Sequence, residues 1–451
     1  MDFDLIRRNW RAFVKPPAPT PKSGDALKFG ILGMSDTASM ALIAPAKQHA
    51  EVAIEAVAAD DLQTAERFAK RHGIPRACSS YQDLLNDPSI NAVYISALAG
   101  DPNPGLEWAL KALTAGKHVL LEPGGWCSVA DTTQAKLVFH SPLAKDQEQA
   151  QHQVEDPEGL GPAGCVLLDA LPYRFHPCWI AFGSLLRRPS IVSAEATVAV
   201  QMTAATNPFF SSSYSPSPSP SQSSSSTAAD LTYQALSVLR AVFGADPDRC
   251  ERWEQRSPRH VLHGSAWRFP NGGVGEARVC LQGGGGASVA GAGINTGAEP
   301  LVRVVVREEE VVGFEEGEER AEEMVVEEEV EKVARREVEL RAYFCGPPLW
   351  NRVVVREEGM VRRKGSGKVV RRWKVEGVGE GERERRRKMK KGVYTLREAG
   401  IEGESEPHWT ASRFLLEEFV NKVRRREGSG AWVGGEESVG LVRMVEMAYG
   451  M

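Results

Sequence analysis

The first 122 residues alternate short apolar runs with amphipathic helical stretches, and this alternation constrains the fold more than any other feature. Four apolar runs predict strands at 28–32, 52–58, 90–97 and 118–122. Between them, residues 62–73 and 106–116 carry leucine and alanine at helical spacing, and each stretch ends at a glycine. Strands that alternate with helices in this way predict an α/β fold with a doubly wound parallel sheet.

The first predicted strand runs through Gly33 into a helix that we expect to begin near Asp36. A strand that turns at glycine into a helix presents free backbone N–H groups to a dinucleotide pyrophosphate. The G-x-G-x-x-G/A pattern is degraded here, with Gly33, Ser35 and Ala38 at its three positions. The turn therefore predicts a nucleotide site that also includes Thr37, and the alternative is a plain buried strand and helix. Asp36 would weaken such a site by repelling the pyrophosphate.

Composition excludes several classes of protein. The 451 residues suffice for two or three domains, and a net charge of −5 gives no reason to expect a nucleic-acid partner. No stretch approaches the ~18 apolar residues of a membrane span. The seven cysteines are scattered and form no C-x-x-C pair, so we expect neither a disulfide framework nor a metal site. The start of the chain lacks a secretory signal pattern, and we expect a cytoplasmic protein.

The remainder of the chain mixes ordered and low-complexity stretches. Strand and helix patterns predict strands at 165–170 and 191–203, a helix at 231–244, a hairpin turning at Asn271-Gly272, and helices at 412–430 (capped by Ser412) and 437–450. A Ser/Pro run at 207–229 and a Gly- and charge-rich region at 282–400 are predicted as loops, although Val runs within 307–342 are strand-like. The charge run 378–391 is predicted to be a solvated loop. We therefore divide the chain into a flexible tail (1–27), a dinucleotide-binding domain (28–164) and a second domain (165–451).

Six stretches, in order along the chain, resemble the Gfo/Idh/MocA-type oxidoreductases, and within them the dimeric dihydrodiol dehydrogenases and fungal NADP-dependent D-xylose dehydrogenases. They are FGILG with ALIAPAK (29–47), LEWALKALTAGKHVLLEP (106–123), VLLDALPYRFHP (166–177), SVLRAVFGADP (237–247), FPNGGVGE (269–276) and EEFVNKVRRREGSGAWVGGEESV (417–439). The resemblance implies an N-terminal Rossmann domain and a C-terminal α/β domain with an open, mainly antiparallel sheet. It also implies a homodimer that transfers hydride between NADP and a carbon of a sugar or vicinal diol.

The resemblance further implies a catalytic lysine at the end of the fourth strand, which this chain lacks. The sequence there is Glu122-Pro123-Gly124, so Glu122 and Pro123 remain as candidates for contact with the cofactor ribose. The nearest lysine, Lys117, begins the same strand and would lie about 16 Å away at ~3.3 Å per residue. It is too distant to replace the missing group.

The family's second catalytic element is an Asp followed four residues later by Tyr or His. Asp230 matches, but Gln234 occupies the acid–base position and cannot exchange a proton near neutral pH. Tyr233 would serve only if the register were shifted by one residue, because neighbouring helix positions differ by about 100°. Three further residues are expected on the substrate side, with a structural role favoured for the histidine: Asn103, Arg174 and His176.

The end of the second strand sets the choice between NAD and NADP. NADP-preferring relatives place Arg where this chain has Asp60. A carboxylate repels a 2′-phosphate and accepts a hydrogen bond from a 2′-hydroxyl, so Asp60 favours NAD, whereas the resemblance implies NADP. The adjacent Asp61 is the better candidate for the N-cap of the helix at 62.

Two functions remain open from the sequence. The chain is either an active NAD(P)-dependent dehydrogenase of sugars or diols, or a degenerate relative that keeps the fold and nucleotide binding but has lost its acid–base groups. Asp230, Tyr233, Gln234 and Glu122 are the residues on which this choice depends.

Overall fold

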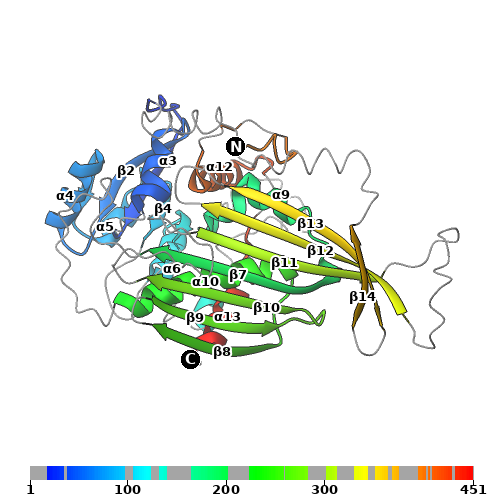
Figure 1. The fold of residues 1–451 in the computed structure, drawn as a ribbon. Helices are drawn as coiled ribbons and strands as arrows, with labels where there is room; N and C mark the ends of the chain where they lie inside the picture. The colour runs from blue at the N-terminus through cyan, green and yellow to red at the C-terminus, as the bar shows by residue number, and fades with distance from the viewer. Residues whose placement is uncertain are drawn as a thin grey trace, which may run out of the picture.

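A computed structural model of the chain shows two β-sheets (Figure 1). It describes residues 18–34, 38–96, 105–122, 132–139, 164–201, 223–257, 260–282, 301–311, 330–343, 351–363, 368–374, 395–402, 405–406, 409–428 and 432–449. Among these residues no helix is long and apolar enough to cross a membrane, and no group of three or more His, Cys, Asp or Glu side chains is placed to hold a metal ion.

The first sheet consists of six parallel strands. They are β1 (Leu27–Leu32), β2 (Val52–Ala58), β3 (Arg76–Cys78), β4 (Ala92–Ile95), β5 (His118–Leu121) and β6 (Leu167–Asp169). Their order is β3-β2-β1-β4-β5-β6, so the direction of winding reverses between β1 and β4. All four residues of β4 are buried, as expected for a parallel strand covered on both faces. The predicted doubly wound sheet is confirmed.

Helices cross over between these strands. They are the π-helical turn η1 (Ser39–Ile43), α3 (Ala44–Lys47), α4 (Leu62–His72), α5 (Tyr81–Asn86), α6 (Gly105–Thr114) and α7 (Thr132–Phe139). The carboxylate of Asp61 accepts a hydrogen bond from the backbone N–H of Thr64 at 2.8 Å, which confirms it as the N-cap of α4. Helix α4 ends at Gly73, whose φ of 71° is in the left-handed region that favours glycine.

Two segments that we assigned to the second domain lie with the first sheet. Strand β6 pairs in parallel with β5, although residues 165–170 were predicted to begin the second domain. Helix α12 (Ala411–Val423) places the ring of Phe419 5.6 Å from that of Phe29 on β1. Its N-cap is Thr410, whereas the predicted cap, Ser412, is buried inside the helix. Apolar periodicity identifies a buried face but not the sheet that buries it.

The second sheet has eight strands. They are β7 (Ile191–Gln201), β8 (Arg249–Ser257), β9 (His260–Arg268), β10 (Val274–Gln282), β11 (Leu301–Val311), β12 (Val330–Tyr343), β13 (Arg352–Arg363) and β14 (Val369–Lys374). Their order is β14-β13-β12-β11-β7-β10-β9-β8, and every pair is antiparallel except β7 with β10. Figure 1 shows helices α9 (Pro177–Gly183), α10 (Ser223–Phe243) and α13 (Gly435–Tyr449) behind one face. The predicted open, mainly antiparallel sheet is confirmed.

The predicted loops are partly wrong. Four strands, β11 to β14, occupy much of 282–400, and α10 already includes residues 223–229. Strand β11 alternates buried Val304 and Val306 with Arg303, which pairs with Glu339 of β12 at 2.9 Å. Much of the charge that suggested a loop therefore alternates with buried valines at a period of two, and Glu308 and Arg336 form a buried ion pair at 3.0 Å. The charge run 378–391 lies outside the described residues.

Candidate functional site

The carboxyl ends of β1 and β4 meet at the point where the first sheet reverses its winding. Gly33 follows β1 with a φ of 81°, and its N–H donates to the carbonyl of Ala58 at 3.0 Å. Ser96 follows β4, and its buried hydroxyl has no hydrogen-bond partner among the described residues. Open α/β sheets bind ligands at this switch point. A buried polar side chain without a partner calls for an explanation, and a bound ligand would supply one. Of the other predicted contacts, Ala38 is buried, and Ser35 and Thr37 lie outside the described residues.

The end of β2 presents two adjacent acids with different roles. Asp61 is committed to the N-terminus of α4, as described above. Asp60 is exposed, and its Oδ1 accepts a hydrogen bond of 2.8 Å from the phenol of Tyr81, the first residue of α5. Asp60 is therefore the acid that remains available to a ligand at this edge of the sheet.

The end of β5 carries Glu122, which is 9% exposed. Its backbone N–H donates to the carbonyl of Ile95 at 2.9 Å, which places it beside the end of β4. Pro123 lies outside the described residues. At the other end of β5, the Lys117 amine donates to the carbonyls of Asp87 and Ile90 at 2.7 and 2.8 Å. Lys117 is thus held away from the site, and the sequence supplies no lysine directly after Glu122.

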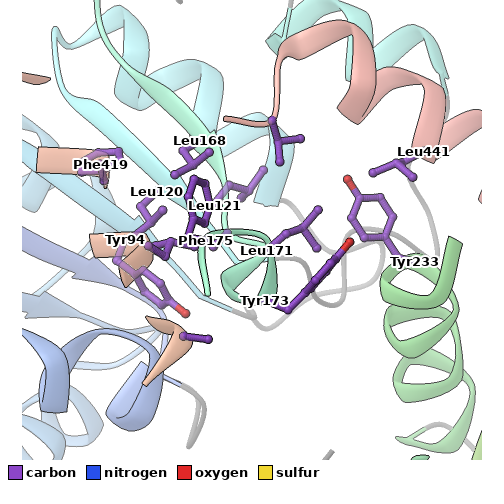
Figure 2. Packing of buried hydrophobic residues seen from close by; sticks show 14 of the residues in the cluster. Tyr94, Leu120, Leu121, Leu168, Leu171, Tyr173, Phe175, Tyr233, Phe419 and Leu441 are labelled. Carbon is purple, nitrogen blue, oxygen red and sulfur yellow. The ribbon is translucent and has the colours of Figure 1, made fainter. Parts of the chain in front are cut away.

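A buried acid lies where β6 meets two helices that follow it in the chain. Asp169 of β6 is 1% exposed, and its Oδ2 accepts hydrogen bonds from the hydroxyls of Tyr233 on α10 and of Ser438 on α13. Burial raises the pKa of Asp169 to about 7, against the opposing effect of these hydrogen bonds. Figure 2 shows Tyr233 extending from α10 toward Tyr173 and Leu441. The phenol of Tyr233 is fully buried, and its hydrogen bond connects α10, which packs on the second sheet, to β6 of the first sheet.

The two basic residues predicted on the substrate side make internal contacts. Arg174 pairs with Glu437 of α13 at 2.9 Å. His176 is 1% exposed and caps α9, where its Nδ1 accepts a hydrogen bond from the N–H of Cys178 at 3.1 Å. Its Nε2 lies 3.2 Å from the amide of Asn351. Burial lowers the pKa of His176 to about 3, so the ring stays neutral, and these contacts are those of a structural residue.

The remaining predicted residues are placed only in part. Asp230 lies within α10, but its side chain is outside the described part of the chain, as is Asn103. Gln234 is half-buried one position after Tyr233, so its side chain leaves the helix about 100° away. The sequence reasoning missed Ser96, Tyr81 and Asp169. Only Asp169 carried a signal, namely an acid inside the apolar run of residues 165–170.

The N-terminal domain can be compared with known families. Residues 27–134 match the oxidoreductase family with an NAD-binding Rossmann fold, Gfo/Idh/MocA. The match begins at β1 and extends into α7. The resemblance predicted from the sequence is thereby confirmed.

Curated relatives carry two activities in their names. Trans-1,2-dihydrobenzene-1,2-diol dehydrogenase of Bos taurus is 42% identical over 171 residues, 37% of this chain and 43% of the relative. D-xylose 1-dehydrogenase (NADP(+)) 2 of Haloferax volcanii is 34% identical over 180 residues, 40% of this chain and 45% of the relative. An uncharacterized oxidoreductase of Rhizobium meliloti is 30% identical over 233 residues, 50% of this chain and 58% of the relative. The chain thus spans about half the length of the curated relatives it matches.

Solved structures extend the likeness of fold to both sheets. Levoglucosan dehydrogenase in complex with NADH and L-sorbose superposes with a TM-score of 0.54 at 13% identity, covering 94% of this chain and 96% of the other. GenD2 from gentamicin A biosynthesis in complex with NAD gives 0.53 at 15% identity, covering 96% of each chain. At these identities the superpositions show the fold alone.

Proposed function

We propose that the chain binds a nicotinamide dinucleotide at the switch point of the first sheet and is a dehydrogenase of sugar or diol hydroxyls. The observation that carries the proposal is the set of groups at the ends of β1, β2 and β4. Gly33 allows close approach of the backbone, Asp60 offers a hydrogen-bond acceptor, and Ser96 has a buried hydroxyl without a partner among the described residues. A close backbone approach, a hydrogen-bond acceptor and a buried hydroxyl together fit a pyrophosphate and a ribose.

The chain's own residues divide the work in this proposal. Gly33 admits the pyrophosphate, and Asp60 accepts from the adenosine ribose, which favours NAD over NADP. The bound nicotinamide supplies hydride chemistry. Glu122 and Asp230 lie at or next to the positions where the resembled family has its catalytic groups, and in this proposal one of these two acids takes the hydroxyl proton. The substrate class comes from the names of the relatives.

A second candidate is a protein that binds the cofactor without turning over a substrate. Three observations favour it. The Lys117 amine is bound by two backbone carbonyls, the Tyr233 phenol is buried against Asp169, and Gln234 cannot transfer a proton near neutral pH.

Cofactor binding and turnover measured together separate these candidates. We expect NAD to bind in calorimetry, and we expect slow reduction of cofactor at 340 nm with D-xylose or trans-1,2-dihydrobenzene-1,2-diol. Gln234→Tyr should raise the rate at least about tenfold, because a positioned acid–base group contributes about 10²–10⁴-fold. Gln234→Phe adds the ring without the hydroxyl and should not raise it. Binding without turnover by any variant would favour the second candidate, and absence of binding would exclude both.

We also propose that the chain forms a homodimer through the face of the second sheet opposite α9, α10 and α13. No described helix covers that face, and it carries rows of paired charges, such as Arg278 with Glu195 at 2.9 Å. Light scattering should give twice the mass of one chain. A single-chain mass would contradict the proposal.

A further inference from the structure

The acid at the end of β2 has a partner that the sequence does not reveal. The phenol of Tyr81 donates to Oδ1 of Asp60 at 2.8 Å across 21 residues of chain. A carboxylate has about four acceptor positions on its two oxygens, so this bond leaves Oδ2 able to accept from a ligand. The neighbouring Asp61 cannot exchange roles with Asp60, because its carboxylate caps α4.

Tyr81 is held firmly enough to orient another side chain. Its ring packs edge-on against Trp108 of α6, with ring centroids 5.2 Å apart. Ser80 caps α5 by accepting from the N–H of Asp83 at 3.1 Å. Leu84 of the same helix packs so closely on Gly30 of β1 that a Cβ at Gly30 would clash with it. The helix, and with it the phenol, is therefore fixed against the sheet.

The phenol is also restricted to one role in its bond with Asp60. Burial, together with the hydrogen bond to Asp60 and the charge of that carboxylate, raises the pKa of Tyr81 well above its usual value. Tyr81 therefore remains protonated throughout the range in which the protein would work, and it acts as the donor while the carboxylate is the acceptor.

We propose that Tyr81 is a positioning residue that sets the cofactor preference by orienting the Asp60 carboxylate toward the adenosine ribose. The inference rests on the proposed binding of a nicotinamide dinucleotide. A fixed carboxylate accepts from the ribose hydroxyls of NAD without first losing its rotational freedom. The same fixed charge cannot swing away from the 2′-phosphate of NADP. Tyr81 thus favours NAD in two ways, by strengthening the bond to the NAD ribose and by keeping the charge near the NADP 2′-phosphate. It need not contact the cofactor itself.

Removal of the phenolic oxygen tests the inference. Dissociation constants for NADH and NADPH are measured by titration calorimetry for wild-type protein and Tyr81→Phe, which keeps the ring on Trp108. We expect NADH to bind about fivefold more weakly, equivalent to about 1 kcal/mol, and NADPH to bind equally or more tightly. An equal loss for both cofactors would mean that Tyr81 acts on the fold and would overturn the inference.

Two further variants separate positioning from packing. Trp108→Phe loosens the contact with the Tyr81 ring but keeps the phenol, and the ratio of the two dissociation constants should change less than in Tyr81→Phe. In an Asp60→Asn background, Tyr81→Phe should no longer alter that ratio, because the phenol acts through the charged carboxylate. An undiminished effect in that background would overturn the inference. If wild-type protein bound neither cofactor, both the proposed function and this inference would fail. If it bound NADH but Tyr81→Phe left the ratio of the two dissociation constants unchanged, only the role of Tyr81 would be overturned.

Discussion

At pH 8 the Asp169→Asn variant is expected to be more stable than wild-type protein, that is, to have the larger free energy of unfolding. This difference should disappear near pH 4. Burial raises the pKa of Asp169 in the folded protein to about 7, from an ordinary value of 3.8. Between these values the folded state holds a proton that the unfolded state has released. The stability that Asp169 contributes to the wild-type protein is therefore fully present below about pH 4 and is lost as pH rises through 7. A change of the pKa from 3.8 to about 7 corresponds to an upper bound of about 4 kcal/mol on this difference in the free energy of unfolding.

The difference in the free energy of unfolding between wild-type protein and Asp169→Asn reports on Asp169 alone and not on other buried residues that titrate. Burial lowers the pKa of His49 to about 4, and His176 is lowered as described above, so both cost stability in acid. Both histidines are present in each protein, and their effects cancel. Urea unfolding at several values between pH 4 and 8 measures the difference. The groups that face Asp169 are Tyr233, Ser438, Glu437 and Arg174.

A second variant tests the direction of the hydrogen bond. Tyr233→Phe removes a donor that favours the charged carboxylate, so the pKa of Asp169 should rise further, and in this variant the loss of stability with rising pH should extend above pH 7. Identical dependence of stability on pH in wild-type and Asp169→Asn proteins would show that Asp169 is not buried as the structure places it.

The first sheet could be predicted because its information is local. Strands β1, β2, β4 and β5 are short apolar runs, and α4 has its own start and stop at Asp61 and Gly73, whereas β3, with the sequence Arg-Ala-Cys, was not predicted. The hairpin of β9 and β10 was equally readable, because Asn271-Gly272 supplies a turn in which Gly272 has a φ of 82°. These features depend on neighbours within a few residues.

The rest depended on contacts that are distant in sequence. Val-rich β11 to β13 contain so many Arg and Glu residues that composition suggested a loop, yet their alternation of apolar and charged residues is that of strands. In the site, the chemistry of Asp60 was readable from its place after β2, but its partner Tyr81 was not. Tyr233 was a catalytic candidate only if the register were shifted by one residue, whereas its contact with Asp169 arises only when β6 and α10 meet.

Replacement of Phe419 by alanine is expected to cost about 3–5 kcal/mol, the range for a large aromatic side chain removed from a packed core. Phe419 is fully buried on α12, and its ring lies 5.6 Å from Phe29 at the centre of the first sheet. Figure 2 shows it in the same core as Leu120 and Phe175. A segment that follows the whole second sheet in the chain thus completes the core of the first.

The matched control is Leu137→Ala on α7, where the side chain is 62% exposed and the change should stay within about 0.5 kcal/mol. Arg426→Ala breaks an exposed ion pair between the segment after α12 and Glu51, which should cost at most about 1 kcal/mol. Urea unfolding measures all three variants. If Phe419→Ala cost no more than Leu137→Ala, α12 would not be docked on the first sheet. If it costs several kcal/mol, the nucleotide-binding unit depends on residues from both ends of the chain, and a fragment ending before α12 should bind no cofactor.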